Sequence, residues 1–105
     1  MEKRYSELSE YELKLEIGSL QEKARKAEQM GMINEYAVYE RKIAMAKAYL
    51  LSPSNFHPGE VYEIDGDPGV TFKIDYMKGI FAWGTREGKN EQEAIPISLL
   101  IKPEK

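Results

Sequence analysis

The 105-residue chain contains no cysteine and one histidine, His57. Without thiols it forms neither a disulfide framework nor a cysteine-ligated zinc site, and it has no cysteine nucleophile. A single imidazole without partners at metal-binding spacing does not indicate a metal centre, so we interpret His57 as a structural or solvated loop residue. The lack of cysteine excludes thiol chemistry, and the single histidine argues against a metal centre built on imidazoles.

The chain also has no excess of positive charge, since it contains 15 Lys and Arg and 18 Asp and Glu. The net charge of −3 does not by itself indicate nucleic acid or a membrane surface as partner. No apolar run approaches the roughly 20 residues of a membrane helix, and the N-terminal stretch lacks the apolar segment of a secretion signal. We therefore expect a soluble, cytoplasmic protein.

Sequence signatures of catalysis are absent as well, including the dinucleotide fingerprint, the phosphate loop and the serine elbow. Four carboxylates gather around one predicted turn: Glu60, Glu63, Asp65 and Asp67. They lack the calcium-loop pattern, so a solvated acidic turn is favoured over a cation site. Since no acid, base and nucleophile set can be assembled, we expect no enzymatic activity, no cofactor and no bound metal.

Helical periodicity dominates the first half of the chain. Ser9 and Glu12 fit a capping box at which a helix begins, and Gly31 fits a left-handed cap that ends it. Between them, apolar residues recur at spacings of four and three, which is the repeat of one helix face: Leu13, Ile17, Leu20, Ala24 and Ala27.

A second helix is predicted from Asn34, as its N-cap, to Leu51, giving an antiparallel helical hairpin over residues 9–51. Pairing about the turn sets Ala44 near Leu20. Two more apolar stripes remain on this helix: Tyr36, Ile43, Ala46 and Leu50 on one, and Val38, Met45 and Tyr49 on the other. We expect one to pack on the strands and the leftover one to meet another subunit in a homo-oligomer.

Residues 52–59 are rich in turn formers and form a joint that is too short to make independent domains. Beyond it, residues 60–102 predict five short strands. The clearest is 70–76, in which Phe72, Ile74 and Tyr76 alternate with polar residues and so share one face. The last two strands are separated by a turn that begins at Pro96.

The stretch GIFAWG, residues 79–84, is apolar on both sides. As a strand it directs Ile80 and Ala82 to one face and Phe81 and Trp83 to the other. Such a strand must be covered twice, so we predict that the helical hairpin and the strands share one interior. The resulting fold class is α+β, a single domain over residues 1–105 with the hairpin packed on a five-stranded SH3-like barrel. A mixed antiparallel sheet on the hairpin is the alternative.

The runs EKRYSELS, LQEKARKAEQMGMINEYAVYERKIAMAKAYLL, FHPGEVY, GIFAWG and EAIPISLL resemble the YfhH family of small uncharacterised proteins from Bacillus and its relatives. The resemblance spans nearly the whole chain. It implies a helical hairpin joined to an SH3-like barrel, in agreement with the patterns above. Members are sometimes labelled transcriptional regulators, but the resemblance implies no role for any particular residue.

Two binding functions are compatible with these features. In the first, the protein is a protein-interaction module that binds a protein or peptide through aromatic residues of the barrel: Tyr62, Tyr76, Phe81 and Trp83. Acidic neighbours such as Asp75 and Glu63 favour a basic ligand. The competing interpretation is that these rings only fill the core.

In the second, the protein is a nucleic-acid-associated regulator with a basic helical face. Its residues are Lys23, Arg25 and Lys26 on the first helix and Arg41, Lys42 and Lys47 on the second. Because glutamates are interspersed, a solvated face of mixed charge is the competing interpretation.

Overall fold

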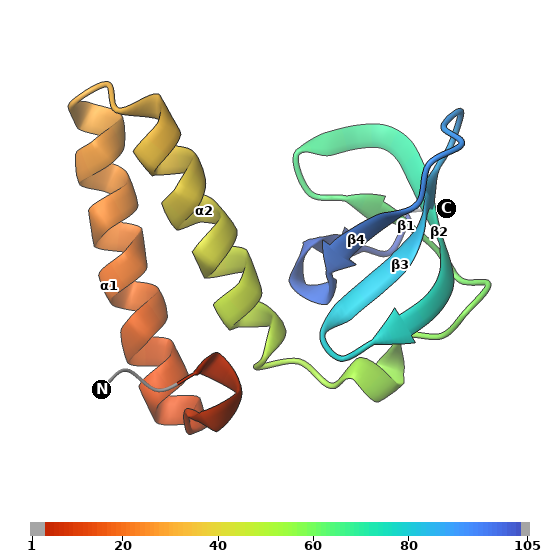
Figure 1. The fold of residues 1–105 in the computed structure, drawn as a ribbon, viewed down its shortest axis with the longest axis horizontal. Coiled ribbons are helices and arrows are strands. Elements are labelled where there is room, and N and C mark those ends of the chain that lie inside the picture. Colours follow the sequence, from red (N-terminus) through yellow and green to blue (C-terminus); the bar gives the residue numbers. More distant parts are fainter. Residues whose placement is uncertain (1–3, 104–105) are drawn as a thin grey trace. The chain divides into compact units, whose positions relative to one another are not determined.

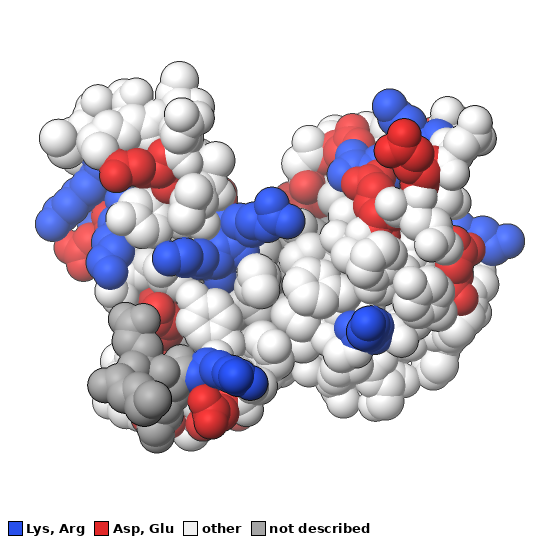
Figure 2. Space-filling model, in the orientation of Figure 1, with Lys and Arg blue, Asp and Glu red and all other residues white. Residues whose placement is uncertain are grey.

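The computed structural model describes residues 4–103, and the chain divides into two compact units, one ending at Leu50 and the other beginning at Leu51. The first consists of helices and the second of a curled sheet, which confirms the α+β class (Figure 1). Side chains of both charge signs lie on the visible face of each unit (Figure 2). The shared interior of hairpin and strands stays a prediction.

Helix α1 spans Glu10–Gln29 and has the predicted ends. At its start, Ser9 Oγ accepts the amide of Glu12 at 3.1 Å, and the Glu12 carboxylate accepts the amide of Ser9 at 3.0 Å. At its end, Gly31 has a φ of 72°, and the amide of Met32 reaches back to the carbonyl of Ala27 at 2.8 Å. This closure is a Schellman turn, which requires a left-handed residue and so favours glycine.

Helix α2 spans Ile33–Ala48, so both predicted ends were wrong by a few residues. The expected cap Asn34 lies inside the helix. The glycine turn is tight enough that Met32 occupies the cap position, and its carbonyl accepts the amide of Tyr36 at 2.9 Å. At the other end, the amide of Tyr49 bonds to the carbonyl of Ala46, three residues back, and this tighter turn ends the helix before Leu51.

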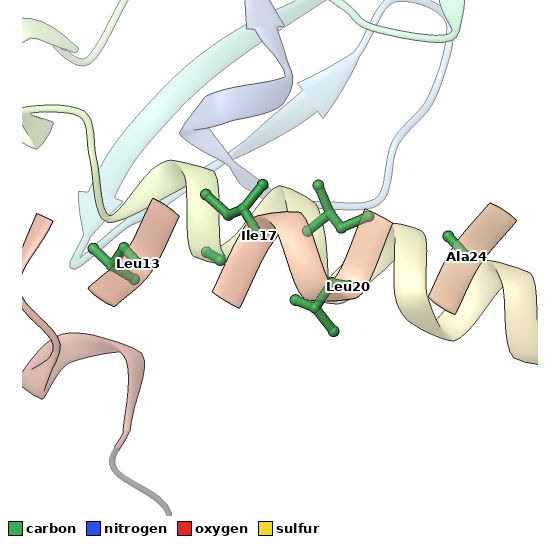
Figure 3. Packing of buried hydrophobic residues seen from close by; sticks show 6 residues of the cluster. Leu13, Ile17, Leu20 and Ala24 are labelled. Carbon is green, nitrogen blue, oxygen red and sulfur yellow. The ribbon is translucent and has the colours of Figure 1, made fainter. Parts of the chain in front are cut away.

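The two helices pack through one apolar cluster (Figure 3), whose buried members are Leu13, Ile17, Leu20, Ala24, Ile43 and Ala46. Tyr36 and Tyr39 are partly buried against it. On α2 the cluster uses Ile43 and Ala46. Ala44, which the prediction placed near Leu20, is also buried. Within residues 4–103, neither helix is long and apolar enough to cross a membrane.

A short 3₁₀ turn, Tyr5–Glu7, precedes α1 and was not predicted. Tyr5 and Leu8 pack on the cluster of the two helices. The Tyr5 ring meets the Tyr49 ring edge-on, with centroids 6.4 Å apart. The helical unit is therefore covered at the open end of the hairpin by its own N-terminal segment.

The second unit is an antiparallel sheet with strand order β4-β3-β2-β1-β5, curled into a half-barrel. The strands are β1 Val61–Ile64, β2 Asp67–Lys78, β3 Phe81–Arg86, β4 Glu93–Pro96 and β5 Leu100–Ile101. The predicted five strands and the 3₁₀ turn before the last one, Ile97–Leu99, are confirmed. A further 3₁₀ turn, Pro53–Asn55, lies in the segment predicted as the joint. Strand β2 begins at Asp67, within the predicted turn.

The inner face of the sheet carries the core, and its fully buried large side chains are Phe72, Ile74 and Ile97. Strand β3 has the predicted two faces: Ala82 and Gly84 are buried on the inside, and Phe81 and Trp83 are half-buried on the outside. A Cβ atom at position 84 would fall on the carbonyl of Lys73 in β2. Only glycine therefore permits the close approach of these two strands.

The Gly84→Ala variant tests this constraint. We expect it to lose at least about 2 kcal/mol of unfolding free energy, because the blocking atom is backbone and cannot rotate away. Urea unfolding followed by the fluorescence of Trp83, the chain's one tryptophan, measures the loss. As a control, Gly18→Ala in α1 meets no atom within 4 Å and should be neutral or stabilising when followed by circular dichroism. Equal stability of the Gly84→Ala variant and the parent contradicts the prediction.

Candidate functional site

The outer face of strands β2, β3 and β4 presents an apolar surface with an aromatic centre. The strand register aligns Tyr76, Trp83 and Ala94 in one row across the sheet. A second row aligns Lys78 with Phe81 and Pro96. We call the apolar members of these rows the outer patch: Tyr76, Phe81, Trp83, Ala94 and Pro96.

A β-bulge places Tyr76 in this patch. The register between β2 and β3 shifts at Asp75, so that Ile74 opposes Gly84 while Tyr76 opposes Trp83. The extra residue rotates the rest of β2 by one side-chain position. The predicted alternation, with Tyr76 on the same face as Ile74, was therefore wrong at its last position: Ile74 is fully buried, whereas Tyr76 is 43% exposed.

Tyr76 and Trp83 form the centre of the outer patch. Their ring planes are nearly parallel, at 4°, and their centroids are 5.9 Å apart. Stacking of this kind contributes about 1 kcal/mol beyond area burial. Beside the pair, the Asp75 carboxylate accepts a hydrogen bond from Gln92 Nε2 at 2.8 Å. The arrangement holds two aromatic rings in fixed orientation on a half-exposed face with a carboxylate at its margin.

Tyr62, the fourth predicted aromatic, lies elsewhere. It is 3% exposed on the inner face, opposite Phe72, and therefore belongs to the core. Its hydroxyl donates to Glu60 Oε1 at 2.8 Å, and its ring lies 5.5 Å from that of Phe56. The structure thus brings together Tyr76, Phe81 and Trp83 from the predicted set.

The Glu60 carboxylate anchors the segment before β1. Besides the Tyr62 hydroxyl it accepts the backbone amide of His57 at 2.8 Å, and His57 Nδ1 lies 3.6 Å from its other oxygen. The hydrogen bond from Tyr62, followed by that from the His57 amide, lowers the pKa of Glu60. Burial, followed by the hydrogen bond to Glu60, raises the pKa of Tyr62 to about 12. His57 is an exposed loop residue that makes these contacts.

The six predicted basic residues are all exposed but do not form one patch. The side of the hairpin on which each residue lies follows from its angle around the helix axis, counted from the face that packs on the other helix. By this measure Lys23, Lys26 and Lys42 lie on one side of the hairpin. Arg25 and Lys47 lie on the opposite side, and Arg25 has Glu22 at 3.8 Å. Figure 2 shows acidic side chains among the basic ones over the helices. The arrangement resembles a solvated mixed face.

A hollow of about 540 Å³ lies at the turn between β3 and β4, lined by Arg86, Gly88, Lys89, Asn90, Glu91 and Glu93. The Arg86 guanidinium contacts Asp67 at 2.6 Å and Glu93 at 2.7 Å. Its charge is balanced by these carboxylates, and it ties the start of β2 to β4. Over residues 4–103, no three His, Cys, Asp or Glu side chains converge as metal ligands would.

The hydrogen bond between Glu60 and Tyr62 predicts that Tyr62, one of the seven tyrosines in the chain, titrates at a higher pH than an ordinary tyrosine. Because the pKa of Tyr62 in the folded protein lies above the ordinary value near 10, its protonated form contributes stability that is lost as the pH rises from about 10 to 12. Glu60→Gln should lower the pKa of Tyr62 but leave it above the ordinary value, since burial remains. Ultraviolet titration, assigned with Tyr62→Phe, measures this, and Glu63→Gln is the control. An unchanged titration in Glu60→Gln contradicts the link.

Comparisons with known proteins identify the family of the chain. Residues 3–101 match a family model described as a protein of unknown function, DUF1811. The chain is also 55% identical over 105 residues to the uncharacterised protein YfhH of Bacillus subtilis strain 168, covering 99% of this chain and 100% of that protein. The chain therefore belongs to the DUF1811 family, which confirms the resemblance seen in its sequence.

Proposed function

We propose that this protein is a non-catalytic protein-interaction module that binds a peptide segment of its partner through the outer patch. The observation that carries the proposal is the stacked pair of Tyr76 and Trp83 on the outer face of the sheet. The pair lies in register with Ala94 of β4, so the apolar surface continues across three strands.

The energetics of such a pair suit binding. Tyrosine and tryptophan offer large contact areas with only two side-chain torsions to immobilise, and they are the commonest residues at which interfaces concentrate their affinity. Stacking already fixes both rings in the free protein. A ligand that covers them therefore loses less free energy to side-chain ordering than one that must fix loose rings.

Charge favours a basic ligand. Residues 51–105 carry nine Asp and Glu against six Lys and Arg, and Asp75 is the bulge residue before Tyr76, at the margin of the patch. Electrostatic complementarity then favours a peptide with apolar and basic residues over a nucleic acid. The alternative, a nucleic-acid-associated regulator acting through the helices, draws on only three lysines on any one side of the hairpin.

We further propose that the half-barrel is an SH3-like barrel and that the module acts in the cytoplasm. Two features support the barrel assignment. Strand β5 returns to pair with β1, and a single 3₁₀ turn separates it from β4. The two edge strands of the sheet, β4 and β5, are only four and two residues long, so binding relies on side chains of the sheet face.

A peptide library displayed on phage tests the binding function. Enriched peptides are synthesised and titrated against the fluorescence of Trp83. We expect peptides that combine basic and apolar residues, and an affinity at least about tenfold weaker for Tyr76→Ser, because a central aromatic contact is removed.

Val61→Ser is the matched control, since Val61 lies on the outer face of β1 with 44% exposure, close to the 43% of Tyr76. Its affinity should equal that of the parent. Failure to enrich any peptide, or equal loss in both variants, contradicts the proposal. Salt-dependent binding of DNA that is lost in Lys23→Glu but kept in Tyr76→Ser supports the nucleic-acid alternative instead.

A further inference from the structure

Helix α1 carries a second stripe, on the side opposite its buried one. Its members recur at the same spacings of four and three residues: Tyr11, Leu15, Gly18, Glu22 and Arg25. Each lies two positions before a buried residue. Two positions correspond to a rotation of about 200° around the helix axis, so the two stripes lie on opposite sides of the helix. Tyr11 is 72% exposed and Leu15 is 57% exposed. Two large apolar side chains therefore project from the N-terminal half of a charged helix face.

Gly18 lies at the centre of this stripe. A Cβ atom there would have nothing within 4 Å among residues 4–103, so none of these residues requires a glycine at this position. Glycine at this position lowers helix stability by about 1 kcal/mol relative to alanine. Its lack of a side chain allows another backbone to approach closely.

We propose that two copies of this chain associate through the second stripe of α1, antiparallel, with a twofold axis at Gly18. The twofold arrangement makes one surface serve both partners, so a single stripe is sufficient. The crossing point is the position without a side chain, and Leu15 and Tyr11 of each copy flank it.

The charge sequence of α1 fits this arrangement. Around the axis, residues equally far from Gly18 face each other across the dimer. Lys14 and Glu22 each lie four residues away, and Glu10 and Lys26 each lie eight residues away, so both pairs are attractive. Tyr11 and Arg25, each seven residues away, bring a guanidinium to an aromatic ring.

The same charges disfavour a parallel pair. Parallel packing sets Lys14 against Lys14 and Glu22 against Glu22, which is repulsive. In the single chain Lys14 contacts Glu10 at 3.1 Å, and Arg25 contacts Glu22 at 3.8 Å. These pairs are well exposed, so their charges remain available to a second copy.

The size of the stripe sets the expected affinity. A helix of 20 residues is about 30 Å long, and one of its faces supplies less than the roughly 800 Å² per partner of a standard interface. We therefore expect a reversible dimer with a Kd on the order of tens of micromolar. The apolar stripes of the sequence predicted such a contact on the second helix, whereas Gly18 and the charge symmetry place it on α1.

Sedimentation velocity over a concentration series in low-salt buffer tests the contact at Gly18. We expect the parent chain to dimerise and Gly18→Gln to weaken dimerisation at least about tenfold, because a long side chain blocks the crossing. Since glutamine is a better helix former than glycine, circular dichroism should show a helix at least as stable as the parent's. Lys23→Gln, on another face of α1, is the control and should dimerise normally. A parent chain that stays monomeric at several hundred micromolar overturns the proposal.

Charge exchange tests the direction of the helices. Lys14→Glu and Glu22→Lys should each weaken the homodimer roughly tenfold, since two attractive contacts become repulsive. An equimolar mixture of the two variants should dimerise again, because the carboxylate introduced in one variant then faces the ammonium group introduced in the other. The double variant should also dimerise. A mixture no more associated than its separate components excludes the antiparallel pairing.

Discussion

The bend of β2 is the constraint on which the sheet unit depends. The first part of this strand pairs with β1 along one edge and the later part with β3 along the other, so its curl shapes the sheet into a half-barrel. Two neighbouring features provide the bend: the close approach of Gly84 to the Lys73 carbonyl, and the bulge at Asp75. The close approach at Gly84 brings β3 against β2. The bulge at Asp75 reverses the faces of the sheet on which the remaining side chains of β2 lie. A buried core on one face and the outer patch on the other both result from this geometry.

Sequence reasoning succeeded where a structure is specified by residues close together in the chain. The capping box of Ser9 and Glu12, the glycine turn at Gly31 and the alternation through Phe72 and Ile74 each involve only a few neighbours. The bulge was not predictable from that alternation, because Tyr76 continues the apolar pattern without interruption. Only the pairing with β3, which depends on distant residues, shows that the pattern changes face.

The packing of the two helices shows the same limit, because it too depends on residues that are distant in the sequence. Periodicity identified the buried face of α1 and set the stripe of Ala44 on α2 against it, leaving two further apolar stripes on α2 for other contacts. The observed cluster includes Ile43 and Ala46, with Tyr5 and Leu8 of the N-terminal segment packed against it, and these residues are distant from one another in the sequence. For the candidate site, the sequence identified three of the aromatic residues and placed Tyr62 with them, because it could not distinguish inner from outer strand positions.

The residues that carry both proposals are not required by the packing inside the chain. Gly18 weakens an exposed helix, and Tyr76, although tyrosine is a favourable strand residue, leaves its ring 43% exposed. Elsewhere the local signals agree with the fold, as they do at Ser9, Gly31 and Gly84. A sequence that is otherwise consistent with its structure and departs from local preference at a few exposed positions indicates that those positions serve contacts outside the folded chain. In a chain without cysteine and with one histidine, the departures lie at surfaces suited to binding, which is where its function is best sought.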